Sequence, residues 1–416
     1  MPIQSFASPS DISRARQHGA MEFSEPPVDL DRVRLYRLGR LREQLKTQDC
    51  AGLLLFDQIN TRYACDATNM QIWCSHYETR CLFVATDGPT VLFDYAYLPH
   101  LAEGLVTVDE YRKIPSFYYF AAGPHCEERA RQFADQIADL MAKHGGGNKR
   151  LAIDRLSHVG TDAIRERGIE VVDGEAVAEQ ARAIKSPEEL ALMRKAIEVC
   201  ETAMADMRAA LRPGITENAL WAKLHETNIR LGGEWIETRL LSSGPRTNPW
   251  FRECSMRPIE AGDLVSFDTD LIGPYGYCAD ISRAWVCGDR PSDEQRRLYA
   301  LAYEQIQHNK SVLKAGKTFR EASEQAWPIP EACRSNRYSS LMHGVGLADE
   351  YPSLKHWEDF PSRGYDGVLE AGMTLCVESF IGVEGGREGV KLEEQVLITE
   401  DGIEQLSAYP MEEDWL

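Results

Sequence analysis

The sequence has no excess of basic residues and no long apolar run. Of its 416 residues, 46 are Lys or Arg and 65 are Asp or Glu, which gives a formal net charge of −19. Such a charge repels phosphate backbones, so nucleic acid is not expected as a partner. No apolar run approaches the roughly 20 residues that span a bilayer, so a membrane partner is not expected either.

Paired cysteine motifs are also absent. The 11 cysteines are an odd number and are scattered without a CxxC pair. Buried free thiols in a reducing compartment explain them better than disulfides or a zinc knot. The first 20 residues contain no apolar core of signal-peptide length. We therefore expect a cytoplasmic protein.

What is present fits two domains. The chain is longer than one ordinary core requires, and 43% hydrophobic with 27% charged residues is typical of a globular protein. Residues 1–30 are polar and predict an N-terminal arm. In residues 31–185, predicted helices (31–48, 127–143) alternate with predicted strands (51–56, 81–95). This alternation predicts an α/β domain.

The clearest boundary is the segment IKSPEEL at residues 184–190. Ser186 can cap a helix, Pro187 suits the first helical position, and Glu189 completes a capping box. Helical patterns continue to about residue 211 and recur at 217–233 and near 292–314, and strand-like segments lie between and after them. Residues 186–416 are therefore predicted to form an α+β domain.

Five candidate metal ligands lie on or beside predicted strands of this second domain. Asp268 and Asp280 are 12 residues apart on two β-like segments with a Gly/Pro turn between them. A hairpin would bring both carboxylates to one face. His343, Glu378 and Glu393 complete the set. Carboxylate oxygens with one imidazole suit Mn, Fe, Co or Zn, often as two ions bridged by carboxylates.

The segments around these residues resemble a known superfamily. SFDTD with GYCADISRAW, MHGVGL, LEAGMTLCVES and GVKLEEQVLIT occur in the order and spacing of the pita-bread creatinase, prolidase and methionine aminopeptidase superfamily (M24). Residues 52–70 also resemble its creatinase-type N-terminal domain. The resemblance implies a creatinase-like α/β domain before a pita-bread catalytic domain, with the metal at the five residues above. It also implies a homodimer, with the N-domain of one subunit near the other's active site.

The chain departs from the peptidases of that superfamily at three places. Asp270 stands where the superfamily usually has a glycine. A further carboxylate beside a metal site is costly unless a cation neutralises its charge. Asp270 is therefore expected to be a sixth metal ligand; the alternative is an exposed carboxylate in a turn. Residues 242–258 contain Trp250 and Phe251 but no histidine. The second histidine that usually follows His343 is missing too. Without these imidazoles, the usual proton donors to a leaving amine are missing, which argues against ordinary peptide hydrolysis unless Asp349 or Glu350 acts as the shuttle.

A metal, a carboxylate and aromatic rings favour elimination instead. A metal that binds a substrate carboxylate acidifies the adjacent carbon, and Asp349, or else Glu350, is then the candidate general base. A sulfonium leaving group needs no proton, and aromatic faces attract it by roughly 0.5–2 kcal/mol per contact. The alternatives are an Xaa-Pro dipeptidase or aminopeptidase, a creatinase-like C–N hydrolase, and a binding module without activity.

Over nearly its whole length the chain also resembles the pita-bread dimethylsulfoniopropionate lyases, the DddP family. The matching features are Asp268-Thr269-Asp270, HGVGLADEYP (343–352), Trp250-Phe251 and NMQIWCSHYETR (69–80). The resemblance implies cleavage of dimethylsulfoniopropionate to dimethyl sulfide and acrylate, a binuclear iron-type centre, Asp349 as the base and a mobile tyrosine. Tyr338 is the candidate tyrosine, unless it is a packing residue. Trp73 is expected either to reach the partner's site or to lie at a dimer interface. The ligands alone would accept manganese or zinc.

Overall fold

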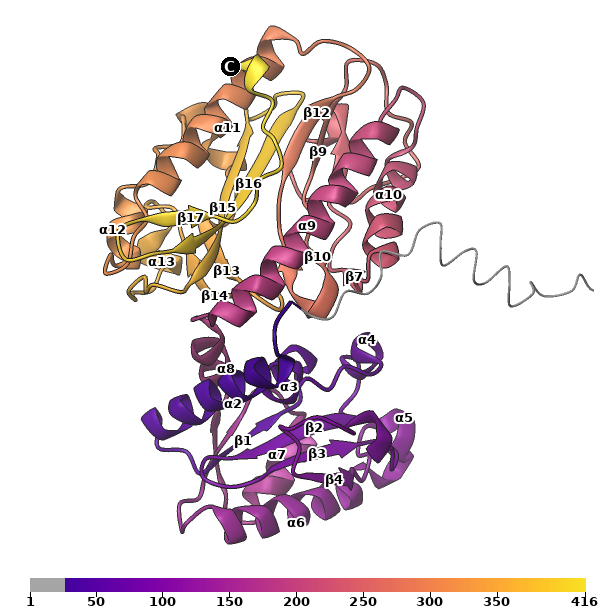
Figure 1. The fold of residues 1–416 in the computed structure, drawn as a ribbon, viewed down its shortest axis with the longest axis vertical. Coiled ribbons are helices and arrows are strands. Elements are labelled where there is room, and N and C mark those ends of the chain that lie inside the picture. The colour runs from indigo at the N-terminus through magenta and orange to yellow at the C-terminus, as the bar shows by residue number, and fades with distance from the viewer. Residues whose placement is uncertain (1–26) are drawn as a thin grey trace, which may run out of the picture.

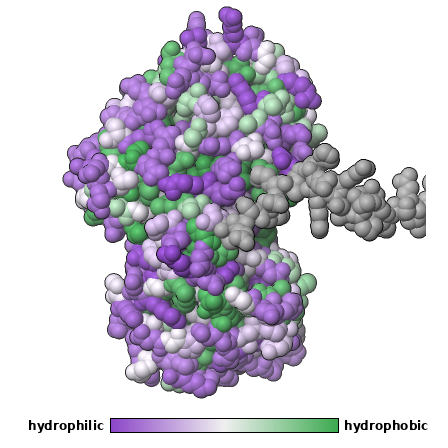
Figure 2. Space-filling view, viewed as in Figure 1, coloured by the Kyte–Doolittle hydropathy of each residue, from purple (hydrophilic) through white to green (hydrophobic). Residues whose placement is uncertain are grey.

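The computed structural model describes residues 27–416, which form two lobes joined by a narrow waist (Figure 1, Figure 2). Most of the visible surface of both lobes is hydrophilic (Figure 2), as the acidic composition suggests. The arm predicted for residues 1–30 lies outside the described residues except for its last four, and helix α2 already begins at Leu30.

The N-terminal lobe is built on one mixed sheet of six strands in the order β4-β3-β2-β1-β5-β6. Strand β1 is apolar and buried along its whole length, and it pairs antiparallel with β2 and parallel with β5. The strands are β1 (Gly52–Leu55), β2 (Arg80–Ala85), β3 (Thr90–Asp94), β4 (Glu110–Lys113), β5 (Arg150–Ile153) and β6 (Glu170–Asp173). The helices are α2 (Leu30–Thr47), α3 (Gln58–Cys65), α4 (Gln71–Cys74), α5 (Tyr119–Ala122), α6 (Cys126–His144), α7 (His158–Arg165) and α8 (Glu175–Arg182). The predicted α/β class of this region is confirmed.

The C-terminal lobe contains three sheets, in the orders β11-β10-β7, β12-β9-β8 and β14-β13-β15-β16-β17. Strand β16 contacts both β9 and β12, so the sheets meet along it. The strands are β7 (Trp235–Ile236), β8 (Leu241–Ser243), β9 (Leu264–Phe267), β10 (Leu271–Ile272), β11 (Cys278–Ala279), β12 (Arg283–Val286), β13 (Met342–Val345), β14 (Asp349–Leu354), β15 (Thr374–Gly382), β16 (Gly389–Ile398) and β17 (Ile403–Gln405).

Helices cover the outside of these sheets (Figure 1). They are α9 (Pro187–Ala210), α10 (Glu217–Arg230), α11 (Asp293–Ser311), α12 (Phe319–Glu324) and α13 (Phe360–Arg363). Helix α9 begins as predicted: the Ser186 hydroxyl accepts from the Glu189 amide, and the Glu189 carboxylate accepts from the Ser186 amide. Helix α11 packs against β15 and β16, which carry part of the candidate site.

The predicted hairpin between Asp268 and Asp280 is present. Leu271 pairs with Ala279 across β10 and β11, and β9 pairs antiparallel with β12. Asp268 and Asp280 lie between these two paired regions, and each is 2% exposed. The hairpin therefore buries both carboxylates in the interior of the lobe.

All 11 cysteines are free, and only Cys126 is not fully buried. The prediction of buried free thiols is thus confirmed. Among residues 27–416, no helix combines the length and the apolar character that a bilayer crossing needs.

One buried arginine joins the two lobes. The Nε of Arg37, on α2, lies 3.0 Å from the Glu189 carboxylate on α9, and its guanidinium also donates to the Tyr277 hydroxyl. Tyr277 in turn donates to Glu189 at 2.9 Å. Because all three side chains are buried, removing the arginine would leave a buried carboxylate without its cation.

We expect Arg37→Met to lower the free energy of unfolding by about 3 kcal/mol, because a buried ion is left unpaired. Urea denaturation followed by circular dichroism measures this. The control is Arg32→Met, which removes an exposed guanidinium 2.6 Å from Glu188 and should cost less than about 1 kcal/mol. Equal, small losses in both variants would show that the Arg37 contacts do not hold the lobes together.

Candidate metal centre

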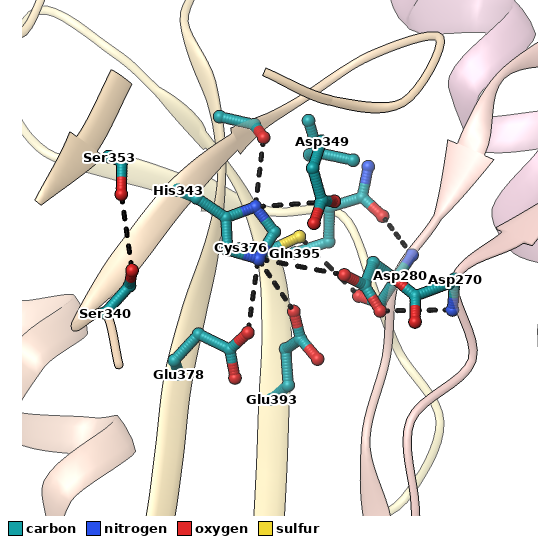
Figure 3. A network of polar contacts seen from close by, with 12 residues as sticks. Asp270, Asp280, Ser340, His343, Asp349, Ser353, Cys376, Glu378, Glu393 and Gln395 are labelled. Atoms are coloured by element: carbon teal, nitrogen blue, oxygen red, sulfur yellow. Dashed lines mark hydrogen bonds and ion pairs between the residues drawn. The ribbon is translucent and has the colours of Figure 1, made fainter. Parts of the chain in front are cut away.

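His343 lies at the middle of the candidate site (Figure 3). Its Nδ1 donates to the carbonyl oxygen of Gly344 at 3.0 Å. Its Nε2 lies 3.1 Å from Glu378 Oε1 and 3.8 Å from both Asp280 Oδ2 and Glu393 Oε1. A backbone carbonyl that fixes one ring nitrogen and leaves the other facing carboxylates is the usual arrangement of a metal-binding histidine.

Carboxylates from two parts of the lobe converge on this imidazole. Asp268, Asp270 and Asp280 come from the hairpin, whereas Glu378 and Glu393 face each other across β15 and β16. None of the five residues is more than 8% exposed. Oxygens of the three aspartates lie within 4.8 Å of one another, and so do oxygens of Asp268, Glu378 and Glu393. The structure thus brings all six predicted ligands together.

The charge state of these groups fits bound divalent cations. Burial, followed by the charge of Asp268, raises the pKa of Asp270 to about 8. Burial, followed by the charge of Asp270, raises the pKa of Asp280 well above its usual range. Glu393 Oε1 is buried and has no hydrogen-bond partner within residues 27–416. Carboxylates this close ionise together only when cations neutralise them, and this donor set suits Mn, Fe, Co or Zn.

Asp270 stands in an unusual backbone conformation. Its φ of +37° lies in the left-handed region that favours glycine. Its amide donates to Asp280 Oδ1 at 3.2 Å, and its carboxylate accepts from the Thr238 hydroxyl at 2.6 Å. At 8% exposure, the alternative of an exposed turn carboxylate is wrong. Backbone strain retained at a buried charge points to a role in the site.

Lys391 is the main residue that the sequence motifs do not reveal. Its fully buried Nζ lies 3.1 Å from Asp268 Oδ2, 2.6 Å from Glu378 Oε2 and 3.0 Å from Glu393 Oε2. Lys391 lies two residues before Glu393 on β16, and side chains two residues apart lie on the same face of a strand. This spacing is the feature of the sequence from which the position of Lys391 in the site could have been predicted. When ionised, five carboxylates and this ammonium carry a net charge of −4, which two divalent cations neutralise.

Two more side chains complete the wall of the centre. The Ser282 hydroxyl lies 2.7 Å from Asp268 Oδ1, 2.8 Å from Glu393 Oε2 and 2.7 Å from Lys391 Nζ. The Cys376 sulfur lies within 4.8 Å of ligand atoms of Asp280, His343 and Glu393 (Figure 3). Neither residue is singled out by the sequence motifs.

A cavity of about 580 Å³ opens beside His343, and Tyr338 and Asp349 also line it. The Asp349 side chain is 55% exposed, and its Oδ1 lies 3.5 Å from His343 Nδ1. Partial desolvation, with Glu378 nearby, raises the pKa of Asp349. Asp349 therefore combines access from the cavity with closeness to the metal-side imidazole, as a general base requires.

Glu350, the alternative base, is placed differently. Its side chain is fully buried, its Oε1 contacts Lys185 Nζ, and its Oε2 lies 3.2 Å from Arg182 Nε. Burial raises the pKa of Glu350, against the opposing charges of Lys185 and Arg182. Its side chain has no exposed surface, however, and both of its oxygens face cations, so it is badly placed to reach a substrate carbon. The structure therefore favours Asp349 over Glu350.

The aromatic residues proposed as substrate contacts differ in their position relative to the cavity. Tyr338 lines the cavity, stacks on Phe251 with ring centroids 5.3 Å apart, and lies over Lys391 Nζ at 4.7 Å. Phe251 is 54% exposed next to it. Trp250, however, is 7% exposed and packs on Phe380, with ring centroids 5.8 Å apart. The structure brings neither Trp250 nor Phe251 into the cavity lining.

Trp73 lies in the N-terminal lobe, on α4. Its ring packs against Tyr77 and Tyr95, with centroids 5.6 and 5.5 Å apart. It is not among the residues that line the cavity of its own chain. Any contact between Trp73 and a substrate would therefore involve the site of a second chain.

Two family models match the chain. Residues 191–400 match metallopeptidase family M24, and residues 37–184 match the creatinase/prolidase N-terminal domain. The chain belongs to the M24 family. This family is metal-dependent, which agrees with the cluster of ligands described above, and the M24 match spans all six predicted ligands.

Two relatives narrow the relationship within M24. The dimethylsulfoniopropionate lyase DddP of Roseovarius nubinhibens is 46% identical over 393 residues, which cover 92% of this chain and 87% of that protein. The DddP of Roseobacter denitrificans is 43% identical over 391 residues, with the same coverage. The predicted place of the chain, in the M24 family near DddP, is confirmed.

The solved structures agree on the fold. The Xaa-Pro dipeptidase from Bacillus anthracis has a TM-score of 0.72 at 22% identity, and the match covers 91% of this chain and 98% of that one. At this identity the likeness shows the fold alone. The predicted combination of a creatinase-like α/β domain and an α+β pita-bread domain is confirmed.

We expect metal binding to release protons at pH 7. In the metal-free chain the Asp270 carboxyl, with a pKa of about 8, is mostly protonated at this pH and must lose its proton to become a ligand. Affinity should therefore rise with pH through about 8. Titration calorimetry with Mn²⁺ in two buffers of different ionisation enthalpy counts the protons.

The control is Asp270→Asn, which should release about one proton fewer per chain. Equal proton release by the wild type and this variant would mean that Asp270 is already ionised in the metal-free protein, and would contradict its assignment as a ligand that gains its charge on binding.

Proposed function

We propose that the chain is a metal-dependent lyase that cleaves dimethylsulfoniopropionate to dimethyl sulfide and acrylate. The two DddP relatives carry this name. The observation in this structure that supports the proposal best is the position of Asp349, a half-exposed carboxylate 3.5 Å from the imidazole of the metal centre. An acceptor at this position suits removal of a proton from carbon rather than protonation of an amine.

The metal would be held by Asp268, Asp270, Asp280, His343, Glu378 and Glu393. We propose iron as the metal, two ions per chain, although manganese or zinc would also suit these ligands. When bound, the metal would supply Lewis-acid chemistry, by which a substrate carboxylate is polarised and the carbon next to it becomes more acidic. Lys391 contributes the remaining positive charge and holds the outer oxygens of three carboxylates.

Asp349 performs the proton transfer. Its carboxylate removes a proton from the carbon adjacent to the substrate carboxylate, and the released electron pair forms the carbon–carbon double bond of acrylate. The carbon–sulfur bond breaks, and its electron pair stays on the sulfur, so dimethyl sulfide leaves neutral without needing a proton. The proton on Asp349 then passes to water, because the side chain is exposed to the cavity.

Aromatic faces next to the base would hold the sulfonium. Tyr338 lines the cavity and Phe251 stacks on it, and an aromatic face attracts a sulfonium by roughly 0.5–2 kcal/mol. Burial raises the pKa of Tyr338 well above its usual range, so the ring stays a neutral phenol. We assign Trp250, which packs on Phe380, to supporting this wall from behind.

The chain is further proposed to act as a homodimer in which Trp73 reaches the partner's cavity. Exposed apolar side chains gather near α4 and α5: Ile72 is 53%, Tyr119 77% and Phe120 78% exposed. Contiguous exposed apolar residues of this kind mark interaction surfaces. We place the protein in the cytoplasm, and its 11 free cysteines favour such a reducing compartment.

We expect purified, iron-loaded protein to release dimethyl sulfide from dimethylsulfoniopropionate, measured by headspace gas chromatography. Asp349→Ala should lower kcat by roughly 10²–10⁴-fold, because it removes the general base, while the iron content stays unchanged. Chelation should abolish the activity, because the ligands then hold no metal. The control is Asp366→Ala, which removes an exposed carboxylate paired with Arg320 and should leave kcat unchanged.

Two results would contradict the proposal. Full activity of Asp349→Ala would move the base elsewhere. Absence of dimethyl sulfide from iron-loaded wild type, together with cleavage of Xaa-Pro dipeptides, would assign the chain to the hydrolases of its fold.

We expect each active site of the dimer to contain Asp349 of one subunit and Trp73 of the other. Trp73→Ala and Asp349→Ala homodimers should each be weakly active. Mixing and reassociating them should recover about a quarter of the wild-type activity, because each heterodimer has one site with both residues intact. Activity equal to the mean of the two parents after exchange would show that Trp73 serves its own chain or none.

A further inference from the structure

We infer that Glu350 is a positioning residue: its buried ion pair with Lys185 holds strand β14, and through it Asp349, against the segment that joins the two lobes. This inference rests on the proposed role of Asp349 as the base. It gives the neighbouring carboxylate a function that the reaction itself does not assign.

Asp349 and Glu350 are the first two residues of β14. Successive side chains of a strand point to opposite faces. The Asp349 side chain is 55% exposed beside His343, whereas the Glu350 side chain has no exposed surface, although Glu350 also belongs to the cavity lining. One short strand thus presents a reactive carboxylate to the cavity and an anchoring carboxylate to the protein interior.

The anchor is a cluster of two cations. Lys185 Nζ contacts Glu350 Oε1 and donates to the carbonyl oxygen of Arg182 at 2.7 Å, and Arg182 Nε lies 3.2 Å from Glu350 Oε2. The side chains of Lys185 and Arg182 are only 3% and 5% exposed. The Lys185 amide donates to the carbonyl oxygen of Gly372 at 3.0 Å, which fixes the lysine to the C-terminal lobe.

Helix α8 of the N-terminal lobe also contacts strand β14. The Glu179 carboxylate accepts from the Tyr351 amide at 2.7 Å and also pairs with Arg182. Arg182 further donates to the Asn60 side chain on α3. The base therefore sits on a strand that residues of both lobes hold, at the waist where β14 lies above α8 (Figure 1).

The glycines before the strand make this packing feasible. A Cβ on Gly346 would lie 2.5 Å from Glu350 Oε1, so any other residue at position 346 would displace the Glu350 carboxylate from its present place. Val345 pairs with Asp349 across β13 and β14. His343 lies on β13 and Asp349 on β14. The distance of 3.5 Å between the side chains of His343 and Asp349 therefore depends on the position in which Glu350 holds β14.

Buried ion pairs are a weak source of net stability, because desolvation offsets their attraction. A pair placed one residue from the base, with contacts to both lobes, is better explained by the geometry it imposes. Misplacing a catalytic group by about 1 Å can cost about 100-fold in rate.

The test is Glu350→Gln in the metal-loaded full chain, with kcat, KM and metal content measured for dimethylsulfoniopropionate. We expect kcat to fall by about 10–100-fold, with KM changed by less than about threefold and metal content unchanged. The matched control is Asp94→Asn, which breaks another buried pair, with Arg80 at 2.8 Å and both side chains 1% exposed. It should lower thermal stability similarly but change kcat by less than about twofold.

A residue that acts through Asp349 has no effect once Asp349 is gone. In the Asp349→Ala background, Glu350→Gln should therefore change the residual rate by less than about twofold. Hydrogen–deuterium exchange of the metal-loaded protein supplies a readout independent of activity: residues 344–351 should exchange faster in Glu350→Gln than in the wild type or Asp94→Asn.

Wild-type kcat in Glu350→Gln, an equal loss in both backgrounds, or unchanged exchange of residues 344–351 would each overturn the inference. Failure of the wild type to release dimethyl sulfide would refute the proposed function instead, and the exchange measurement would still decide whether Glu350 fixes the strand.

Discussion

The repulsion among five buried carboxylates is the constraint on which the catalytic lobe depends. A hairpin and two paired strands from different parts of the chain bring them within a few ångströms of one another, with three of them beside His343. Lys391 is the buried ammonium among them and neutralises a single charge. Burial, together with the remaining negative charge, raises the pKa values of Asp270, Asp280 and Glu393 in the absence of metal. This charge also explains why cations would stabilise the fold and supply the chemistry at once.

Given that centre, the reaction is decided by the groups that handle protons around it. Residues 242–258 contain no histidine, and none follows His343 closely in the HGVG segment. A half-exposed carboxylate, Asp349, lies at the cavity instead. A carboxylate that accepts one proton from carbon, beside aromatic rings that attract a sulfonium, provides what an elimination needs and lacks what an amide hydrolysis needs. The fold is shared with dipeptidases, and in the proposed mechanism the difference in chemistry rests on these few side chains.

The parts of the structure that the sequence predicts are those governed by local rules or by ordered motifs. The capping box at Ser186 and Glu189 depends on four consecutive residues, so α9 begins where expected. Of the six predicted ligands, His343, Glu378 and Glu393 lie on strands and the three aspartates lie directly beside strands, in the order that the motifs give. Lys391, Ser282 and the inward side of Glu350 depend instead on which strand faces which across the lobe, and the surroundings of Trp250 depend on Phe380. Such contacts follow from tertiary packing, which no local pattern encodes.

A crystal structure of iron-loaded Asp349→Asn with dimethylsulfoniopropionate bound tests the central claim most directly. The account predicts two anomalous iron peaks among the six ligand side chains, with the carbon next to the substrate carboxylate within hydrogen-bond reach, about 3 Å, of the residue 349 side chain. A site without iron, or a substrate whose reacting carbon faces a group other than residue 349, would contradict it.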